Sequence, residues 1–425
     1  MSSLKGRLVS KAPLFALGAG LVLIPALYGA GVLSIETVNQ LGRFLCFAIV
    51  AIGIDLVWGY TGILTLCQAM FFTLGGYAMG MHLALHGPLD GDGIPRCLFV
   101  VTSDVSGFKL PEFWEPFRTL PGALLLAVLI PGLAAFIFGF FAFRSRVKGV
   151  YFSIITQATT LGVCLLFRRN EMRLCGTNGL TNFVKLGGFD LQSSDVKLGL
   201  YVLTVLVLAA LYVLCKVMVN SRFGRILAAI RDNEGRLRAL GYKPLYYKLA
   251  VFTLAAAIAG IGGMLYTPQT GIITPFNMEP DKSIFLVVLV AVGGRCTLSG
   301  AVIGSIVVNY VYSLLTSGTI YNKIFSPANG GDASQVQKLF ELLLGPKGWP
   351  FVLGALFLGV VMFMPDGLIG IWRKFIAEDA EVKSTPTPTP TGAASAPHDA
   401  DPKQPHAPPT ATLLSASPTA PGGNA

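Results

Sequence analysis

The chain has 425 residues, of which 53% are hydrophobic and only 13% are charged, and its mean hydropathy is +0.64. A soluble domain usually carries about 25% charged residues, so this composition argues strongly against an ordinary water-soluble enzyme. Several apolar runs reach the ~20 residues that an α-helix needs to cross a hydrocarbon core. The sequence therefore predicts an all-α polytopic membrane protein.

About ten apolar runs are candidate transmembrane helices. They lie at roughly 12–33, 41–58, 64–85, 119–142, 150–167, 198–219, 249–267, 281–294, 297–316 and 350–371. The run at 281–294 is too short to cross alone, and Gly293 and Gly294 are expected to break it before the next run begins. The predicted transmembrane domain is therefore 12–371, after an N-terminal segment at 1–11.

Basic residues are unevenly divided between the two sets of connecting segments. The N-terminus, 143–149, 221–248, Arg295 and 372–376 hold 16 basic and 2 acidic residues, whereas the other set holds 13 of each. Connections rich in Lys and Arg stay on the cytoplasmic side. This asymmetry and an even number of spans predict that both termini are cytoplasmic.

The last part of the chain differs sharply in composition from the rest. Residues 377–425 have a net charge of −3, against +13 for the first 376 residues, and 383–425 contain ten prolines and no aromatic residue. Such a segment cannot bury enough apolar surface to offset the entropy of ordering. We therefore expect 377–425 to be a disordered, Pro/Thr/Ala-rich cytoplasmic tail.

Sequence features of an enzyme are absent. The chain has no GxxxxGK[ST] phosphate-binding loop and no set of residues suited to hydrolysis. His82 and His86 have a metal-compatible spacing but no third ligand, so no metal and no cofactor is expected. Cys97 and Cys175 are the two cysteines in external connections, and whether they pair is left open.

Asp55 is the best candidate for an ion-relaying carboxylate within a span. It lies near the cytoplasmic end of its run, so a bond to nearby backbone or to a tryptophan is the favoured role. An ion-coupled secondary transporter that works alone remains an alternative from a different functional class.

The segment from Asn220 to Lys248 is polar enough to lie outside the membrane, yet apolar residues recur in it at helical spacing. These residues are Phe223, Ile226, Leu227, Ile230, Leu237 and Leu240. Gly241 is placed to end the helix and Pro244 to begin the next one. The pattern predicts a basic amphipathic helix that lies either on lipid or against a partner protein.

This segment resembles the cytoplasmic coupling loop of permease subunits in ATP-binding cassette (ABC) importers. Glu234, Ala239 and Gly241 fall where that loop's motif has its Glu, Ala and Gly. More closely, the chain resembles the branched-chain amino acid and urea permease family over residues ~35–371.

Five stretches carry the resemblance: Asp55–Tyr77, Phe143–Thr156, Gly176–Asn182, Val292–Gly304 and Met364–Gly370. Within the family, the urea-type permease subunits (UrtC type) are the most similar. The chain departs from the family pattern at Cys67-Gln68, where a Gly-His pair is usual.

The resemblance implies an importer in the bacterial inner membrane with several partners. These are a second permease subunit, two ATP-binding subunits that hydrolyse ATP, a periplasmic solute-binding protein and membrane lipid, with no nucleic acid. It further implies that 220–241 is the cytoplasmic coupling helix. The residues expected to couple it to the ATPase are Arg222, Gly224, Arg225, Arg231, Asp232, Glu234 and Gly241.

Urea is the expected substrate. It is neutral and planar, so amide and hydroxyl side chains suit it, whereas an amino acid is a zwitterion and few charges in the spans could help it. The candidate pathway residues are Thr65, Gln68, Phe71, Phe72, Thr156, Gln157, Thr177 and Asn178. The first alternative is that the chain is a subunit of the same type of ABC importer but that the substrates are branched-chain amino acids.

Overall fold

The computed structural model describes 17–87, Pro95, 110–145, Val147, 149–316 and scattered positions between 351 and 370. The predicted N-terminal segment 1–11, the tail 377–425 and Cys97 lie outside the described residues, and the predicted span 350–371 is described only in part.

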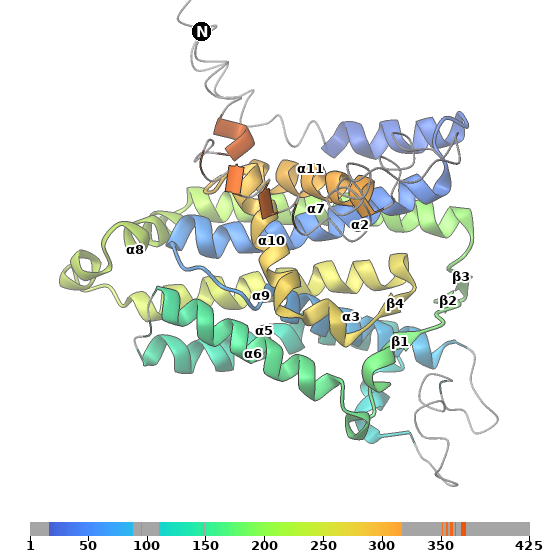
Figure 1. Ribbon diagram of the computed structural model, residues 1–425, viewed down its shortest axis with the longest axis horizontal. Helices are drawn as coiled ribbons and strands as arrows, with labels where there is room; N and C mark the ends of the chain where they lie inside the picture. Colours follow the sequence, from blue (N-terminus) through green and yellow to red (C-terminus); the bar gives the residue numbers. More distant parts are fainter. Residues whose placement is uncertain are drawn as a thin grey trace, which may run out of the picture. The chain divides into compact units, whose positions relative to one another are not determined.

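The described part consists of α-helices joined by 3-10 turns and two-residue strands (Figure 1). After an apolar helix at Leu17–Gly29 come α2 (Ile35–Ile54), α3 (Gln68–Leu85), α5 (Leu120–Arg144), α6 (Val150–Phe167), α7 (Ser194–Asn220), α8 (Arg222–Ala239), α9 (Pro244–Thr270), α10 (Pro280–Gly293) and α11 (Leu298–Thr316).

Six described helices are long and apolar enough to cross a membrane: α2 with its π-helical continuation η1 (Asp55–Gly59), α5, α6, α7, α9 and α11. The prediction of ten spans is therefore not confirmed. As predicted, α10 is short: its 14 residues end at Gly293, and Gly294, which follows, has φ +116°. The predicted span 64–85 is also incomplete, because its helix, α3, begins only at Gln68.

The start of α2 differs from the prediction in a way that matters for function. The run at 41–58 was expected to begin at Leu41, but the helix begins at Ile35, where Ser34 caps it by accepting a hydrogen bond from Thr37 N at 3.3 Å. Asn39 and Gln40, which precede the predicted run, lie within the helix together with Arg43. Helix α2 therefore continues well before Arg43, and this cation lies inside it rather than at its start.

Helix α9 packs against α3, α5 and α2. Its three closely spaced glycines each meet a different helix: Gly260 lies against α5, Gly262 against α2 and Gly263 against α3. A Cβ at Gly260 or Gly263 would collide with backbone atoms of the neighbouring helix. These glycines therefore allow α9 to pack closely against its three neighbours.

Residues 62–67, between η1 and α3, are not helical. Backbone of this kind at membrane depth needs partners for its polar groups, because lipid offers none. Helix α6 supplies them from one face. Ser153 Oγ donates to Leu64 O at 2.9 Å, Thr160 Oγ1 donates to Leu66 O at 3.2 Å, and Leu66 N donates to Thr156 Oγ1 at 3.1 Å.

At the opposite end of the helices from α8, short strands connect distant parts of the chain (Figure 1). Strand β1 (Leu180–Thr181) pairs antiparallel with β4 (Ile272–Ile273), and β2 (Lys185–Leu186) pairs with β3 (Phe189–Asp190). The β1–β4 pair joins the α6–α7 connection, which contains η4 (Gly176–Asn178), to the connection between α9 and α10.

The substitution Thr156→Val leaves the partly buried Leu66 N without its acceptor, which should destabilise the protein by about 1 kcal/mol. Thr159→Val is the matched control, since that hydroxyl bonds only to Ile155 O of its own helix. Thermal unfolding in detergent should show a lower midpoint for Thr156→Val than for Thr159→Val. Equal midpoints would contradict this role of Thr156.

Candidate functional site

The predicted coupling helix forms, but as two segments rather than one. Asn233 interrupts α8 with φ −159° and ψ 96°. The second segment restarts because Asn233 Oδ1 accepts a hydrogen bond from Arg236 N at 2.9 Å. Gly241, with φ +86°, follows the helix end, and Pro244 begins α9, both as predicted.

The apolar face of α8 packs on the protein itself. Leu227, Ile230 and Leu237 are buried in a core shared with α2, α7 and α9, while Leu240 is 70% exposed. Gly224 is buried against the backbone of Val219 in α7. The described contacts therefore favour a helix docked on protein over one lying on lipid.

Glu234 fastens α8 to α9. Its carboxylate accepts hydrogen bonds from Arg238 at 2.5 Å and from the buried Lys248 Nζ at 2.6 Å. Burial alone would raise the pKa of Glu234, but the two cations outweigh it and lower that pKa below its ordinary value. Glu234 is therefore ionised at neutral pH and holds the second segment of α8 against α9.

Arg231 ties the first segment of α8 to two other parts of the chain. Its Nη1 donates to Gly59 O at 3.2 Å and lies 2.9 Å from Cys296 Sγ, while its Nε donates to Asp232 at 3.2 Å. Gly59 ends η1 and Cys296 lies between α10 and α11, so one guanidinium joins α8 to two other segments. We call this group of contacts the Arg231 junction.

The same junction holds the α10–α11 connection against the end of α2. Asp55 Oδ1 accepts a hydrogen bond from Cys296 N at 2.8 Å, and Tyr60 Oη donates to Cys296 O at 3.1 Å. The guanidinium of Arg295 lies 4.2 Å from the ring centre of Trp58. As predicted, Asp55 bonds to backbone. The role of Cys296 was not predicted, and nothing in its sequence context indicates it.

The other predicted coupling residues lie on the exposed side of α8. Arg222, Arg225 and Asp232 are exposed, and a side chain added at Gly241 would meet no described atom within 4 Å. Tyr242 and Tyr246, which follow Gly241, are 45% and 61% exposed. The turn between α8 and α9 therefore presents an uncovered surface with aromatic and basic groups.

The predicted pathway residues fall into separate places. Gln68 and Thr65 are buried at the break before α3, and neither the Gln68 amide nor the Thr65 hydroxyl has a hydrogen-bond partner in the described structure. Thr156 supports the same break. Gln157 is half-buried on α6, and Thr177 and Asn178 are exposed in η4 at the opposite end.

The aromatic candidates Phe71 and Phe72 are buried in ring contacts. Phe71 lies 5.6 Å from Phe252, and Phe72 lies 5.1 Å from Tyr266, measured between ring centres. They place apolar surface next to the break, on the side facing α9.

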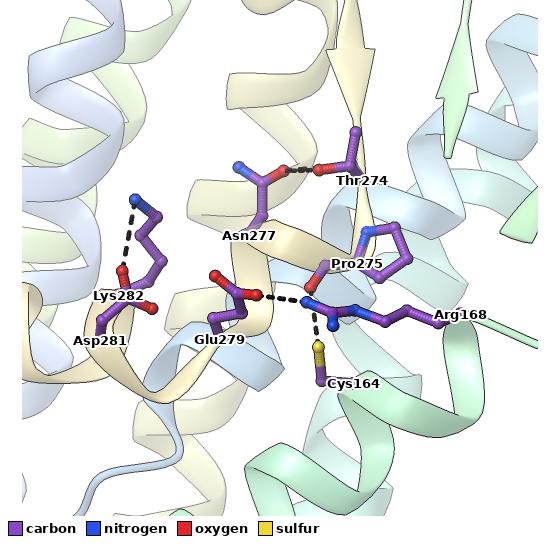
Figure 2. Close-up of polar contacts among 8 residues, drawn as sticks. All are labelled: Cys164, Arg168, Thr274, Pro275, Asn277, Glu279, Asp281 and Lys282. Atoms are coloured by element: carbon purple, nitrogen blue, oxygen red, sulfur yellow. Dashed lines mark hydrogen bonds and ion pairs between the residues drawn. The ribbon is translucent and has the colours of Figure 1, made fainter. Parts of the chain in front are cut away.

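A polar cluster that the sequence did not reveal joins α6 to the start of α10 (Figure 2). Arg168 forms an ion pair with Glu279, and its guanidinium lies 4.5 Å from the ring centre of Phe276. Cys164 Sγ donates to Pro275 O at 3.3 Å. The cluster ties the end of α6 to η5 (Pro275–Met278), far from α8.

No group of three metal-ligating side chains occurs within the described residues. His82 Nδ1 lies 2.9 Å from Phe117 O, and His86 Nδ1 lies 2.9 Å from His82 O. Both imidazoles are thus engaged by backbone carbonyls.

Several known proteins are similar to this chain. The high-affinity branched-chain amino acid transport system permease protein LivM of Salmonella typhimurium is 26% identical over 64% of this chain and 60% of its own length. The probable branched-chain amino acid transport permease protein LivM of Methanocaldococcus jannaschii is 25% identical over 77% of this chain and 91% of its own length. The autoinducer 2 import system permease protein LsrC of Salmonella choleraesuis is 27% identical over 58% of this chain and 62% of its own length.

The chain spans about three fifths of the length of the LivM proteins of Salmonella typhimurium and Escherichia coli. No solved structure matches it. The family described as the permease component of branched-chain amino acid transport systems matches residues 37–363, which is most of the chain. With its six apolar helices, the chain is therefore an integral membrane protein that belongs to the branched-chain amino acid transport permease family.

Proposed function

We propose that this chain is a membrane subunit of an ATP-driven (ABC) importer and that branched-chain amino acids are its substrates. The observation that carries the proposal is the placement of α8. One side is fastened to the membrane helices through Arg231 and Glu234, while the turn at Gly241 is uncovered. The match to a permease family supports the same assignment.

In this proposal an ATP-binding subunit contacts the exposed surface of α8. Arg222, Arg225 and the turn at Gly241 offer charge and open space for docking. Movement of α8 then reaches the end of α2 and the α10–α11 connection through the Arg231 junction. ATP hydrolysis belongs to two such partner subunits, and no catalytic role falls to this chain.

The remaining partners are a second permease subunit and a periplasmic solute-binding protein. The proposal places the chain in a bacterial inner membrane with the α8 end and both termini in the cytoplasm. The excess of Lys and Arg in the connections at that end supports this orientation.

Branched-chain amino acids replace urea as the first choice of substrate for two reasons. Two of the relatives described above are named as branched-chain amino acid permeases. The argument for urea also assumed that the spans carry few useful charges, and Arg43 lies within α2.

Urea remains the second candidate because of one observation. The Gln68 amide and the Thr65 hydroxyl are buried and have no hydrogen-bond partner in the described structure. A planar neutral amide could bond to both. The ion-coupled alternative has weaker support, because the carboxylate that suggested it, Asp55, accepts a hydrogen bond from the Cys296 backbone.

Deleting the gene should abolish ATP-dependent uptake of labelled leucine at limiting concentration, while uptake of labelled urea stays unchanged. Restoring the gene should restore leucine uptake. Loss of urea uptake alone would favour the second candidate. Leucine uptake that stops when ion gradients are dissipated at constant ATP would instead indicate a secondary transporter.

The substitution Glu234→Gln should loosen the second segment of α8 by about 1–3 kcal/mol, because Lys248 and Arg238 lose their charged partner. Faster amide hydrogen exchange at residues 234–241 would report it. Asp232→Asn, at a carboxylate whose side chain is 70% exposed, is the control and should have little effect.

Protonation of Glu234 sets the pH dependence of its contacts with Lys248 and Arg238. The pKa of Glu234 is lowered in the folded chain, so its stabilisation is complete at neutral pH and is lost as the pH falls through that lowered pKa. Unchanged exchange in Glu234→Gln would show that the pair does not hold α8.

A further inference from the structure

Arg43 is a cation inside a membrane helix, and no acidic residue in the described part of the chain pairs with it. It lies eight residues after the start of α2, about 12 Å along the helix axis. Its Nε is buried and has no hydrogen-bond partner, and no described carboxylate forms an ion pair with it. Glu36, the one acidic residue of α2 before Asp55, pairs with Lys197 instead. A charge in this position usually marks a functional site.

The described side chains near Arg43 include a thiol, a phenol and an amide. Arg43 lies close enough to Cys46 of α2 and Tyr266 of α9 to act on both electrostatically. One turn earlier on α2, Gln40 bonds to Ser313 of α11. The described polar groups near the guanidinium are therefore not carboxylates.

An aromatic cluster lies one turn further along α2 from Arg43. Phe47 lies 5.5 Å from Phe72 of α3, 5.3 Å from Tyr266 and 6.4 Å from Phe285 of α10, measured between ring centres. Phe285 in turn lies 5.3 Å from Tyr312 of α11. Five helices thus each contribute one ring to an apolar surface beside the cation.

The geometry points to a carboxylate-binding site at Arg43, with the aromatic cluster receiving the apolar part of the same ligand. A guanidinium binds a carboxylate through two parallel hydrogen bonds, and the neighbouring rings offer apolar surface without competing charge. Together they fit a small amino acid with an aliphatic side chain and do not favour neutral urea. This inference rests on the proposed importer function and deepens it by assigning the group that recognises the substrate's charge.

Two variants of similar size separate charge from packing. Arg43→Met removes the cation, whereas Arg43→Lys keeps it but loses the planar fork. Gln40→Met is the control on the same helix, since that amide bonds to Ser313 and not to Arg43. Each variant is assembled with the second permease subunit, the ATP-binding subunits and the solute-binding protein in proteoliposomes. ATP-driven uptake of labelled leucine is measured beside ATP hydrolysis.

We expect Arg43→Met to lower leucine uptake by about tenfold or more, as loss of a charge-assisted pair should, with ATP hydrolysis retained. Arg43→Lys should recover part of the uptake, and Gln40→Met should match the unsubstituted protein. Full uptake by Arg43→Met would overturn this inference and leave the importer function standing. If Arg43→Met and Arg43→Lys both lose uptake and ATP hydrolysis to the same extent, the inference is also overturned, because that result indicates a structural role for Arg43. No ATP-driven leucine uptake by the unsubstituted complex would overturn the proposed function itself.

Discussion

The organisation of this permease depends on one polar junction at the α8 end of its helices. The Arg231 guanidinium contacts Gly59 O at the end of η1 and Cys296 Sγ between α10 and α11. Asp55 accepts the Cys296 amide hydrogen, so the two connections also hold each other. Arg231 of α8 contacts both connections. When α8 moves relative to the other helices, these contacts must therefore either break or move the two connections with it.

A second constraint acts within the helices, where the chain is broken before α3. Hydroxyls on one face of α6 take over the backbone hydrogen bonds that residues 62–67 cannot make as a helix. This arrangement explains why Thr156, predicted as a pathway residue, has a structural contact. The buried Gln68 amide beside the same break has no partner in the described residues and keeps a substrate role open to test.

Local sequence patterns predicted the bounds of several helices, but they could not predict contacts between residues far apart in the sequence. Apolar run length placed α6 at its observed bounds and α9 within a few residues, and Gly241 and Pro244 marked the boundary between α8 and α9 correctly. The start of α2 was predicted at Leu41 instead of Ile35 because polar residues precede Leu41, so Arg43 was expected at the end of the helix rather than inside it. The contact of Arg231 with Cys296 was not predictable, since 65 residues separate them and neither side chain signals the other.

The central claim is that the Arg231 junction transmits ATP-driven movement of α8 to the membrane helices. It is tested most directly by the number of leucine molecules taken up per ATP hydrolysed in the reconstituted importer. Arg231→Gln should lower this ratio while hydrolysis continues, and Arg144→Gln, at an exposed position at the end of α5, should leave it unchanged. An unchanged ratio in Arg231→Gln would contradict the claim.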